Sequence, residues 1–444
     1  MSASLNSRIA ADFDTATGGL PATGAAAARR RAAVERLLAR GLPGPREENW
    51  KYANLRPLER LRFMPALPAA AQLAGLPTDL PPALEGFTRY VFVDGVPVGT
   101  AATSTAATGT ASAADASAAL VTLGNVRDDG PLHHAERAAG ADERFALLNG
   151  AFATAETGIH VPATAREPAR LELLYVASAD AQAGASYPRV AVRVDADAQL
   201  VLLERHLSAA ATPSFVNSAV AVEVARGARL EHYRLQELNT RSILFDTLSA
   251  QVAQHGTYRL HAISTGGQSA RSTSTIRLTG EHAELALAVV ALGDRQQVQD
   301  AYAVVAHDSP NARTTQTFRG IAAGRARVAF NGKIVVARGA HGTDSQQSLR
   351  GLLAGPEAEI DVRPQLEIYT DDVRCSHGAT AGKLDDQMLF YLLSRGLDRD
   401  TAQRLLKWAF LEDVIAPINH PALRRQIETR LAAHLRDETL RELV

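Results

Sequence analysis

The chain has 444 residues, of which 46% are hydrophobic and 21% charged, and its formal net charge is −1. This composition is typical of a globular protein with two or three domains, and the near-neutral charge argues against nucleic acid or an anionic membrane as a partner. A single cysteine excludes an internal disulfide framework, and the lack of a signal-peptide core or of an apolar run near the roughly 20 residues of a membrane span predicts a cytoplasmic protein.

The N-terminal region, residues 1–158, is predicted to be helical around a small strand pair. Residues 25–40 are rich in good helix formers and place Val34 and Leu37 on one face, which indicates a helix. The run Arg29–Arg31 within it is more typical of a solvated helix face than of a nucleic-acid site, because the chain carries no net positive charge.

Four shorter features complete this region. Trp50, in GLPGPREENWKYANL, is expected to be buried and to fix its loop onto a domain. A strand pair is predicted over residues 88–99 around the turn Asp94–Gly95, and residues 142–152 (DERFALLNGAF) are predicted to form a helix. The Ala/Thr/Ser segment 101–119 buries little apolar surface and is predicted to be a loop or tether.

Residues 159–370 form a region of short alternating runs such as VAVRV and VAVEV, which are typical of strands. A loose repeat recurs here, with aliphatic anchors separated by 30, 30, 25, 43 and 32 residues. These periods predict stacked coils of a parallel β-helix, since an antiparallel sandwich would turn every 8–12 residues. The interval of 43 residues is expected to hold two coils or a protruding loop. The anchors are Leu200, Leu230, Leu260, Leu285, Val328 and Ile360.

Residues 371–444 are predicted to be a C-terminal domain of three helices. Asp385 or Asp386 is expected to cap the first helix, Asp398 the second, and Pro421 opens the third. One face of the second helix is expected to carry Leu405, Ala409, Val414 and Ile418.

The pair Cys375 and His377 carries the strongest chemical signal in the chain. A soft thiolate and an imidazole two residues apart can bind one metal ion. An iron–sulfur cluster usually needs four Cys-type ligands, so a second chain would have to complete such a site. The alternative is a small buried cysteine beside a histidine that bonds a loop carbonyl. Gly378 and Gly382 favour the metal site, because they permit another backbone to approach closely.

The surrounding segment also resembles a known family. Residues 367–396 contain E-I-Y-x-D-D-V-x-C-S-H-G-A-T-x-G followed by F-Y-L-x-S-R-G, which resembles the shared signature of the SufB/SufD proteins of the SUF iron–sulfur cluster assembly system. Residues 43–55 resemble P-x-x-x-x-E-x-W-K-Y-x-x-L, a motif of the SufD branch that SufB-type chains typically lack. The resemblance covers residues from about 41 to about 418, with 101–119 outside it.

The resemblance implies a mainly β protein with a right-handed parallel β-helix core between helical regions, and a scaffold subunit rather than an enzyme. In the family the β-helix pairs with SufB, and the helical tail binds SufC, the ATPase that alone holds ATP. The family's motif histidine, here His377, lies at the SufB interface where a transient iron–sulfur cluster assembles. Cys375 lies beside it, although the essential thiolates are attributed mainly to SufB. No tightly bound cofactor is expected.

Three other interpretations compete with this one. The segment Gly378–Leu384 faintly resembles a phosphate loop, but it is one residue short and lacks the Ser/Thr for magnesium, so a turn before a helix is predicted. A homodimeric β-helix used only for assembly geometry is a second interpretation, since β-helix edges tend to find a partner. A β-helix carbohydrate lyase or hydrolase is the third, and its groove would use the side chains of His307, Asp308, Arg313, Lys333, His341 and Asp344. We expect those side chains on coil corners and outer faces instead, with Gln346 and Gln347 stacked in a ladder.

Overall fold

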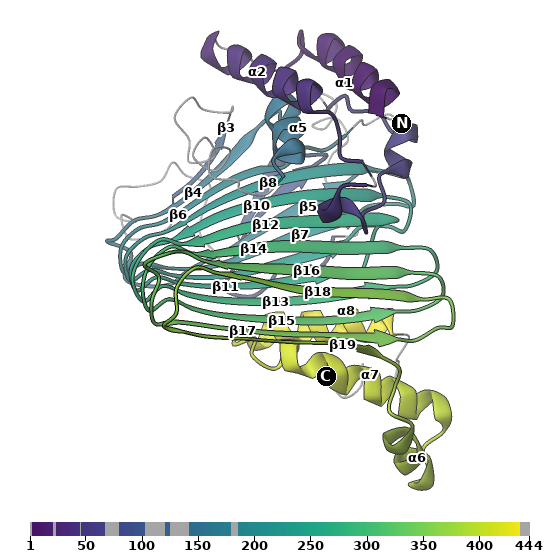
Figure 1. Cartoon of the computed structure of the whole chain (residues 1–444). Helices are drawn as coiled ribbons and strands as arrows, with labels where there is room; N and C mark the ends of the chain where they lie inside the picture. The colour runs from purple at the N-terminus through teal and green to yellow at the C-terminus, as the bar shows by residue number, and fades with distance from the viewer. Residues whose placement is uncertain are drawn as a thin grey trace.

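The computed structural model describes residues 2–20, 24–44, 46–66, 80–102, 120–124, 142–178 and 185–435. Its centre is a stack of flattened coils with helices at both ends (Figure 1). The stack is a parallel β-solenoid of about eight turns, which confirms the predicted mainly β fold with a parallel β-helix core. The predicted loop 101–119 lies almost wholly outside the described residues.

Two sheets run along the whole stack. Consecutive strands alternate between them, so that one sheet holds the odd-numbered strands and the other the even-numbered strands from β4 onward. The helices are α1 (Ser2–Ala16), α2 (Gly24–Arg40), α5 (Arg144–Phe152), α6 (Asp386–Ser394), α7 (Arg399–Ile415) and α8 (Pro421–His434), with short 3-10 helices η1 (Glu48–Trp50) and η2 (Arg56–Arg60). The strands of the odd sheet are β1 (Thr88–Val93), β5 (Ala169–Ala177), β7 (Gln199–Ser208), β9 (Arg229–Glu237), β11 (Thr257–Ser264), β13 (Glu284–Gly293), β15 (Arg313–Ala322), β17 (Thr343–Leu353) and β19 (Val373–Gly382), with β2 (Val96–Ala102) at its edge. Those of the even sheet are β4 (Glu156–Val161), β6 (Arg189–Val194), β8 (Phe215–Val224), β10 (Ile243–Val252), β12 (Ser269–Leu278), β14 (Val298–His307), β16 (Arg327–Val336) and β18 (Glu359–Ile368), with β3 (Leu120–Gly124) at its edge.

The strand register tests the predicted repeat. Leu200 pairs with Leu230 on the next coil, as the repeat predicts. The next partner of Leu230 is Tyr258 rather than Leu260, and Tyr258 in turn pairs with Leu285. The interval of 43 residues holds neither two coils nor a protruding loop. It runs from β13 in one sheet to β16 in the other, past β14 and β15, and therefore spans about one and a half coils.

Six successive corners on one edge of the solenoid are each fixed by a left-handed residue. At the corner from the even to the odd sheet, the backbone N–H of Asp197 donates to Arg226 O at 3.0 Å, and that of Gly227 donates to Gln254 O at 2.9 Å. The pattern continues coil by coil, and the left-handed residues form one column. Two features favour glycine at position 227: its φ is +68°, and an added Cβ would come within 2.1 Å of Asp197 Oδ1. The column consists of Asp197, Gly227, His255, His282, Asn311 and Gly342.

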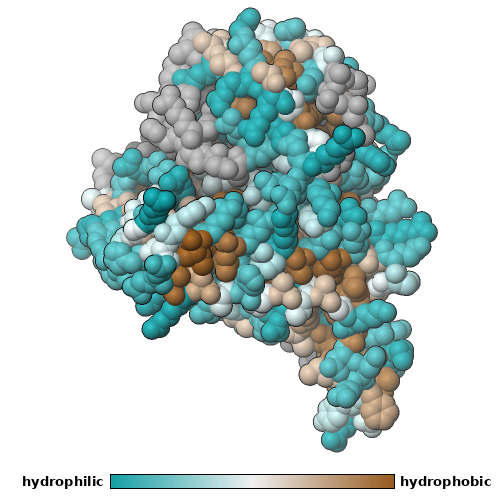
Figure 2. Space-filling view, in the orientation of Figure 1, coloured by the Kyte–Doolittle hydropathy of each residue, from teal (hydrophilic) through white to brown (hydrophobic). Residues whose placement is uncertain are grey.

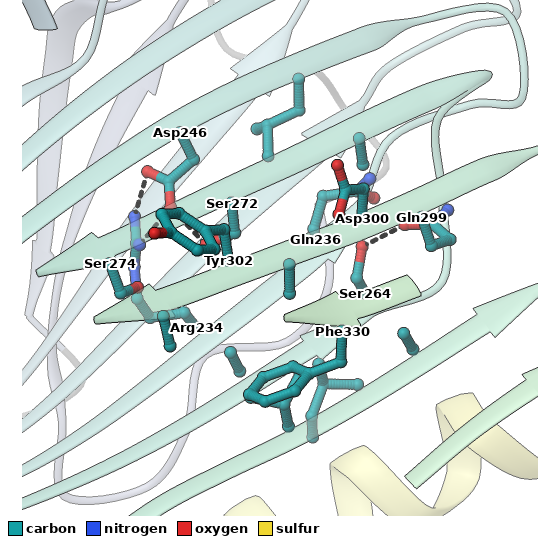
Figure 3. A pocket seen from close by; sticks show the side chains of 18 of the residues that line it. Arg234, Gln236, Asp246, Ser264, Ser272, Ser274, Gln299, Asp300, Tyr302 and Phe330 are labelled. Carbon is teal, nitrogen blue, oxygen red and sulfur yellow. Dashed lines mark hydrogen bonds and ion pairs between the residues drawn. The ribbon is translucent and has the colours of Figure 1, made fainter. Parts of the chain in front are cut away.

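The interior of the solenoid, which we call the bore, is filled by the alternate side chains that point inward from both sheets. Most of them are aliphatic and form one continuous core. A charged cluster interrupts this core, because Arg234 bonds both Glu204 and Asp246. It borders a cavity of about 70 Å³ that also touches His206 and Phe330 (Figure 3).

The N-terminal elements pack on the outside of the first coils. Val34 and Leu37 are buried on one face of α2, as predicted. Arg30 is not on a solvated face, contrary to expectation, because it is buried and donates to Ala151 O at 3.1 Å. Trp50 is buried as predicted, and the Arg271 guanidinium lies 4.5 Å from its ring centroid, which fixes the loop onto the even sheet. The predicted strand pair is the antiparallel hairpin of β1 and β2, which turns at Asp94–Gly95.

The predicted three helices follow the last coil. The Asp385 side chain accepts from the N–H groups of the first turn of α6, Asp398 does the same for α7, and Pro421 opens α8. In α7 the predicted Val414 is buried, but Ala409 is exposed, because the buried stripe runs through Leu411 and Ile415 instead. Helices α7 and α8 cover the outer face of the odd sheet, whereas α6 extends away from the solenoid (Figure 1). No helix among the described residues is long and apolar enough to cross a membrane.

Candidate metal-binding site at the last coil

Cys375 and His377 lie on β19, the last strand of the solenoid. The sequence suggested that strands end near residue 370 and that 378–384 form a turn, but residues 373–382 pair in parallel with β17 along their whole length. This segment has few β-branched residues, so its strand conformation depends on the neighbouring coil that it pairs with rather than on local propensity.

Both side chains face the bore. Residues in register on neighbouring parallel strands point to the same side of a sheet. Cys375 pairs with Ser345 and His377 pairs with Gln347, and both of these partners are buried side chains of the preceding coil. Cys375 and His377, two residues apart, therefore share the inward face of β19 and stand at the open end of the bore.

The last coil leaves this end of the bore uncovered within the described part of the chain. Strands β18 and β19 are the end strands of their sheets, so each has one edge without a neighbouring strand. The inward residues Ile360, Val362 and Val373 are only partly buried here, whereas Ile334 and Leu349 of the preceding coil are fully buried. Just beyond β18, Tyr369 is 57% exposed. Hydrophobic side chains gather over these last coils and at the tip of the tail (Figure 2). Such a surface is typical of a docking site for another protein chain.

The glycines of the motif leave space beside the strand. A Cβ added to Gly378 or Gly382 would meet no atom within 4 Å, and neither residue has a positive φ. Their backbone conformation therefore does not require glycine. What the absent side chains provide is an approach for another backbone on the exposed part of β19.

The donor set is incomplete within this chain. In the described residues, no three His, Cys, Asp or Glu side chains are grouped as metal ligands. Burial and the nearby Asp344 carboxylate raise the pKa of the Cys375 thiol, although a backbone hydrogen bond at Ser345 offsets part of the effect. A bound cation would favour the thiolate, so metal binding at Cys375 is coupled to loss of its proton. Cys375 and His377 together offer two donors, fewer than the four ligands that an iron–sulfur cluster usually needs.

The residues considered for a carbohydrate groove do not converge. His307 is buried in the bore, bonds the Thr314 hydroxyl at 2.9 Å, and burial lowers its pKa to about 4. Asp308 pairs with Arg277 at 2.8 Å on the outside of the even sheet. The outward Lys333 pairs with Glu367 at 2.7 Å. His307 therefore departs from the expected corner or outer face and packs inside the bore, whereas Asp308 and Lys333 form surface ion pairs as expected, and these three side chains do not line one groove.

A ladder of side-chain amides lies beneath Cys375 and His377, and the sequence predicted only part of it correctly. Gln347 Nε2 donates to Gln316 Oε1 at 3.0 Å, which confirms a ladder at Gln347, but Gln346 is exposed and in register with Thr315. The available signal was the alternation of β17, since Gln347 is two residues from Ser345 and shares its inward face. Gly332 makes room for the ladder, because an added Cβ would come within 2.9 Å of Gln347 Nε2.

Fold and site together define a class: a parallel β-solenoid whose last coil carries a thiol and an imidazole on its inward face, at an end of the bore that no described residue covers. Comparison with known proteins agrees with this class. Residues 175–410 match the family model described as "SUF system FeS cluster assembly, SufBD core domain". The chain therefore belongs to the SufB/SufD family of iron–sulfur cluster assembly proteins.

Its relatives include proteins of similar length. The iron–sulfur cluster assembly protein SufD of Escherichia coli K12 is 30% identical over 90% of this chain and 91% of the relative. An iron–sulfur cluster assembly SufBD family protein of Synechocystis is 26% identical over 90% of this chain and 89% of the relative. The chloroplastic protein ABCI7 of Arabidopsis thaliana is 29% identical over 54% of this chain and 51% of the relative.

Proposed function

We propose that the chain is a noncatalytic scaffold subunit of a SUF complex that pairs with a SufB-type chain through its last coil. The observation that carries this proposal is the half site at an open end: Cys375 and His377 face the end of the bore from an edge strand. A partner that covers this end buries the exposed apolar residues of β18 and β19 and adds ligands in one step. The transient iron–sulfur cluster is the cargo of the assembled site, not a resident cofactor.

The projecting helix supports a second contact. Met388, Phe390 and Tyr391 of α6 are 60%, 71% and 55% exposed. Large apolar side chains on one short helix that leans away from the core are typical of a helix-docking surface. We propose that the SufC-type ATPase binds here, so that ATP is hydrolysed on the partner and this chain transmits the resulting motion to the solenoid.

Cluster loading in the assembled complex tests the proposed site. The chain is coexpressed with SufB- and SufC-type subunits, purified without oxygen, and analysed for iron and acid-labile sulfide. We expect His377→Ala to lower both contents several-fold while the three subunits still copurify. The matched control is His341→Ala, which removes an exposed histidine from the preceding coil corner. Wild-type iron and sulfide in the His377→Ala complex would show that the proposed site is wrong.

The isolated chain offers a simpler test of the docking surface. Without a SufB-type partner, the uncovered strands β18 and β19 are expected to pair with a second copy. Light scattering of the purified chain should therefore report a dimer, and a charge introduced on the inward face of the last coil by Val362→Asp should return it to a monomer. A monomeric wild-type chain at high concentration contradicts this expectation.

A further inference from the structure

An unsatisfied polar atom lies directly beneath the proposed ligand His377. Gln347 is 4% exposed, and its Oε1 is shielded from solvent without a hydrogen-bond partner among the described residues. A buried amide oxygen without a donor is unfavourable by about 1–3 kcal/mol, so such atoms in folded proteins usually have a partner. The side chain in register above Gln347 on the last coil is His377, one strand spacing away.

The direction of the Gln347 amide follows from its other contacts. Its Nε2 lies 3.0 Å from Gly332 O and 3.0 Å from Gln316 Oε1. A backbone carbonyl can only accept, so the atom that faces Gly332 must be the NH₂ group. The amide nitrogen thus points toward the preceding coil and the even sheet. Its oxygen points away from Gln316, toward the coil that carries His377.

We propose that Gln347 is a positioning residue, whose amide oxygen accepts a hydrogen bond from the Nδ1–H of His377. The two side chains are not bonded to each other in the structure, but Nδ1 is the ring nitrogen closer to the backbone and neighbouring strands lie only about 4.8 Å apart, so a change of the His377 rotamer brings this nitrogen within reach of the amide. A proton held on Nδ1 leaves Nε2 without a proton and directed out of the bore. A metal-bound histidine usually donates its second ring N–H in this way, which fixes the tautomer and the ring orientation.

The consequence for assembly rests on the proposed function. Binding of iron then requires no rearrangement of the imidazole, because the ring nitrogen that faces the partner chain is already free of its proton. The hydrogen bond itself needs no partner and no metal, since Gln347 and His377 belong to one chain. The hydrogen bond and its consequence for iron binding can therefore be tested separately.

The tautomer of His377 in the full-length chain tests the hydrogen bond. Histidine is labelled with ¹⁵N, spectra are recorded near pH 8 without metal, and the His377 signals are assigned by their loss in His377→Gln. We expect the Nδ1–H tautomer in the wild-type chain. A wild-type spectrum dominated by Nε2–H, the form that an imidazole without such a partner adopts in water, overturns the proposal without recourse to any Gln347 variant.

Variants of the amide ladder separate positioning from folding. Gln347→Met removes the acceptor and should convert His377 to the Nε2–H tautomer, whereas Gln347→Glu keeps an acceptor and should retain Nδ1–H. Gln316→Met is the matched control, because it breaks the same ladder bond one coil deeper but leaves Gln347 Oε1 in place. An unchanged tautomer in a folded Gln347→Met chain, or an equal change in Gln316→Met, contradicts the assignment.

Cluster retention gives the second readout in the coexpressed complex. Loss of a hydrogen-bond partner behind a ligating histidine typically weakens metal binding by 10–100-fold, and we expect Gln347→Met to release iron to a chelator faster by a factor in this range. If His377→Ala abolishes loading while Gln347→Met leaves both tautomer and release unchanged, the inference fails and the proposed function stands. If His377→Ala loads normally, the proposed function fails, and the tautomer still decides the hydrogen bond.

Discussion

Replacement of Arg234 by methionine tests how the charged cluster in the bore is stabilised. Arg234 Nε lies 2.9 Å from Glu204 Oε2. Its second guanidinium arm lies 2.9 Å from Asp246 Oδ1 (Figure 3). Burial alone would raise the pKa of Glu204, but Arg234 and His232 outweigh it and hold that pKa well below its usual range. Without the guanidinium, the buried carboxylates of Glu204 and Asp246 lose the cation that they share, and at least one must bind a proton.

The expected loss of stability in Arg234→Met follows from the free-energy cost of binding that proton. At pH 7, protonating a carboxyl group whose ordinary pKa is near 4 costs about 4 kcal/mol, since each pH unit is worth about 1.4 kcal/mol. This agrees with the roughly 3–5 kcal/mol typical of breaking a buried ion pair by removing one partner. At pH 5 the same proton costs only about 1 kcal/mol. Arg234→Met should therefore lower the free energy of unfolding by about 4 kcal/mol at pH 7 and much less at pH 5.

Urea unfolding at both pH values, followed by circular dichroism, measures this difference. The double variant Arg234→Met/Glu204→Gln should recover most of the loss, because one buried charge is removed with its partner. Arg259→Met is the control, since Arg259 is half exposed and 3.7 Å from Glu231, and pairs of this kind contribute about 0–1 kcal/mol. Equal losses at pH 7 and pH 5 would refute the reasoning.

Three further predictions concern the last coil and the tail. The raised pKa of Cys375 should make its alkylation by iodoacetamide slower at pH 7.5 than that of a free thiol, and Asp344→Asn should accelerate it by removing a nearby negative charge; a faster wild-type rate contradicts this. Burial and the Glu359 carboxylate raise the pKa of Asp361 to about 6, so the folded state binds an extra proton between about pH 4 and 6 and loses stability as pH rises through that window. After discounting for solvent screening, Asp361→Asn should gain about 1 kcal/mol at pH 7.5 and nothing below pH 4 in urea unfolding, and an equal gain at both pH values would exclude this cause. On α6, Phe390→Asp should abolish capture of the SufC-type ATPase while the SufB-type chain still copurifies, and full capture would place that contact elsewhere.

The sequence predicted those features that one strand or helix encodes by itself. Leu200 and Leu230 stand 30 residues apart because one coil has about that length, and their stacking follows directly. The caps Asp385 and Asp398 were equally local, since a carboxylate before a helix accepts from the N–H groups of its first turn. Which residue of β11 pairs with Leu230 could not be read locally, because it depends on the length of each corner. The repeat predicted Leu260, and the structure has Tyr258.

The parts of the candidate site that pairing creates could not be predicted in this way. Cys375 and His377 were recognised by their chemistry, but the strand on which they lie exists through its pairing with β17. Their common direction into the bore follows only once the register with Ser345 and Gln347 is known. Arg30 illustrates the same limit, because its burial depends on Ala151, a residue 121 positions away.

The column of left-handed corner residues has a consequence for how such a chain can vary in length. The corners from β6–β7 to β16–β17 are tied to one another by backbone bonds such as His255 N to Glu281 O at 3.0 Å, although they hold between four residues, at 195–198, and six, at 337–342. Extra residues at these corners are therefore accommodated outside the bonded column, which keeps its spacing. Natural insertions, and any tag or sensor grafted between coils, should be tolerated at such corners when they bulge away from the column, which leaves the candidate site at the end of the stack in its alignment.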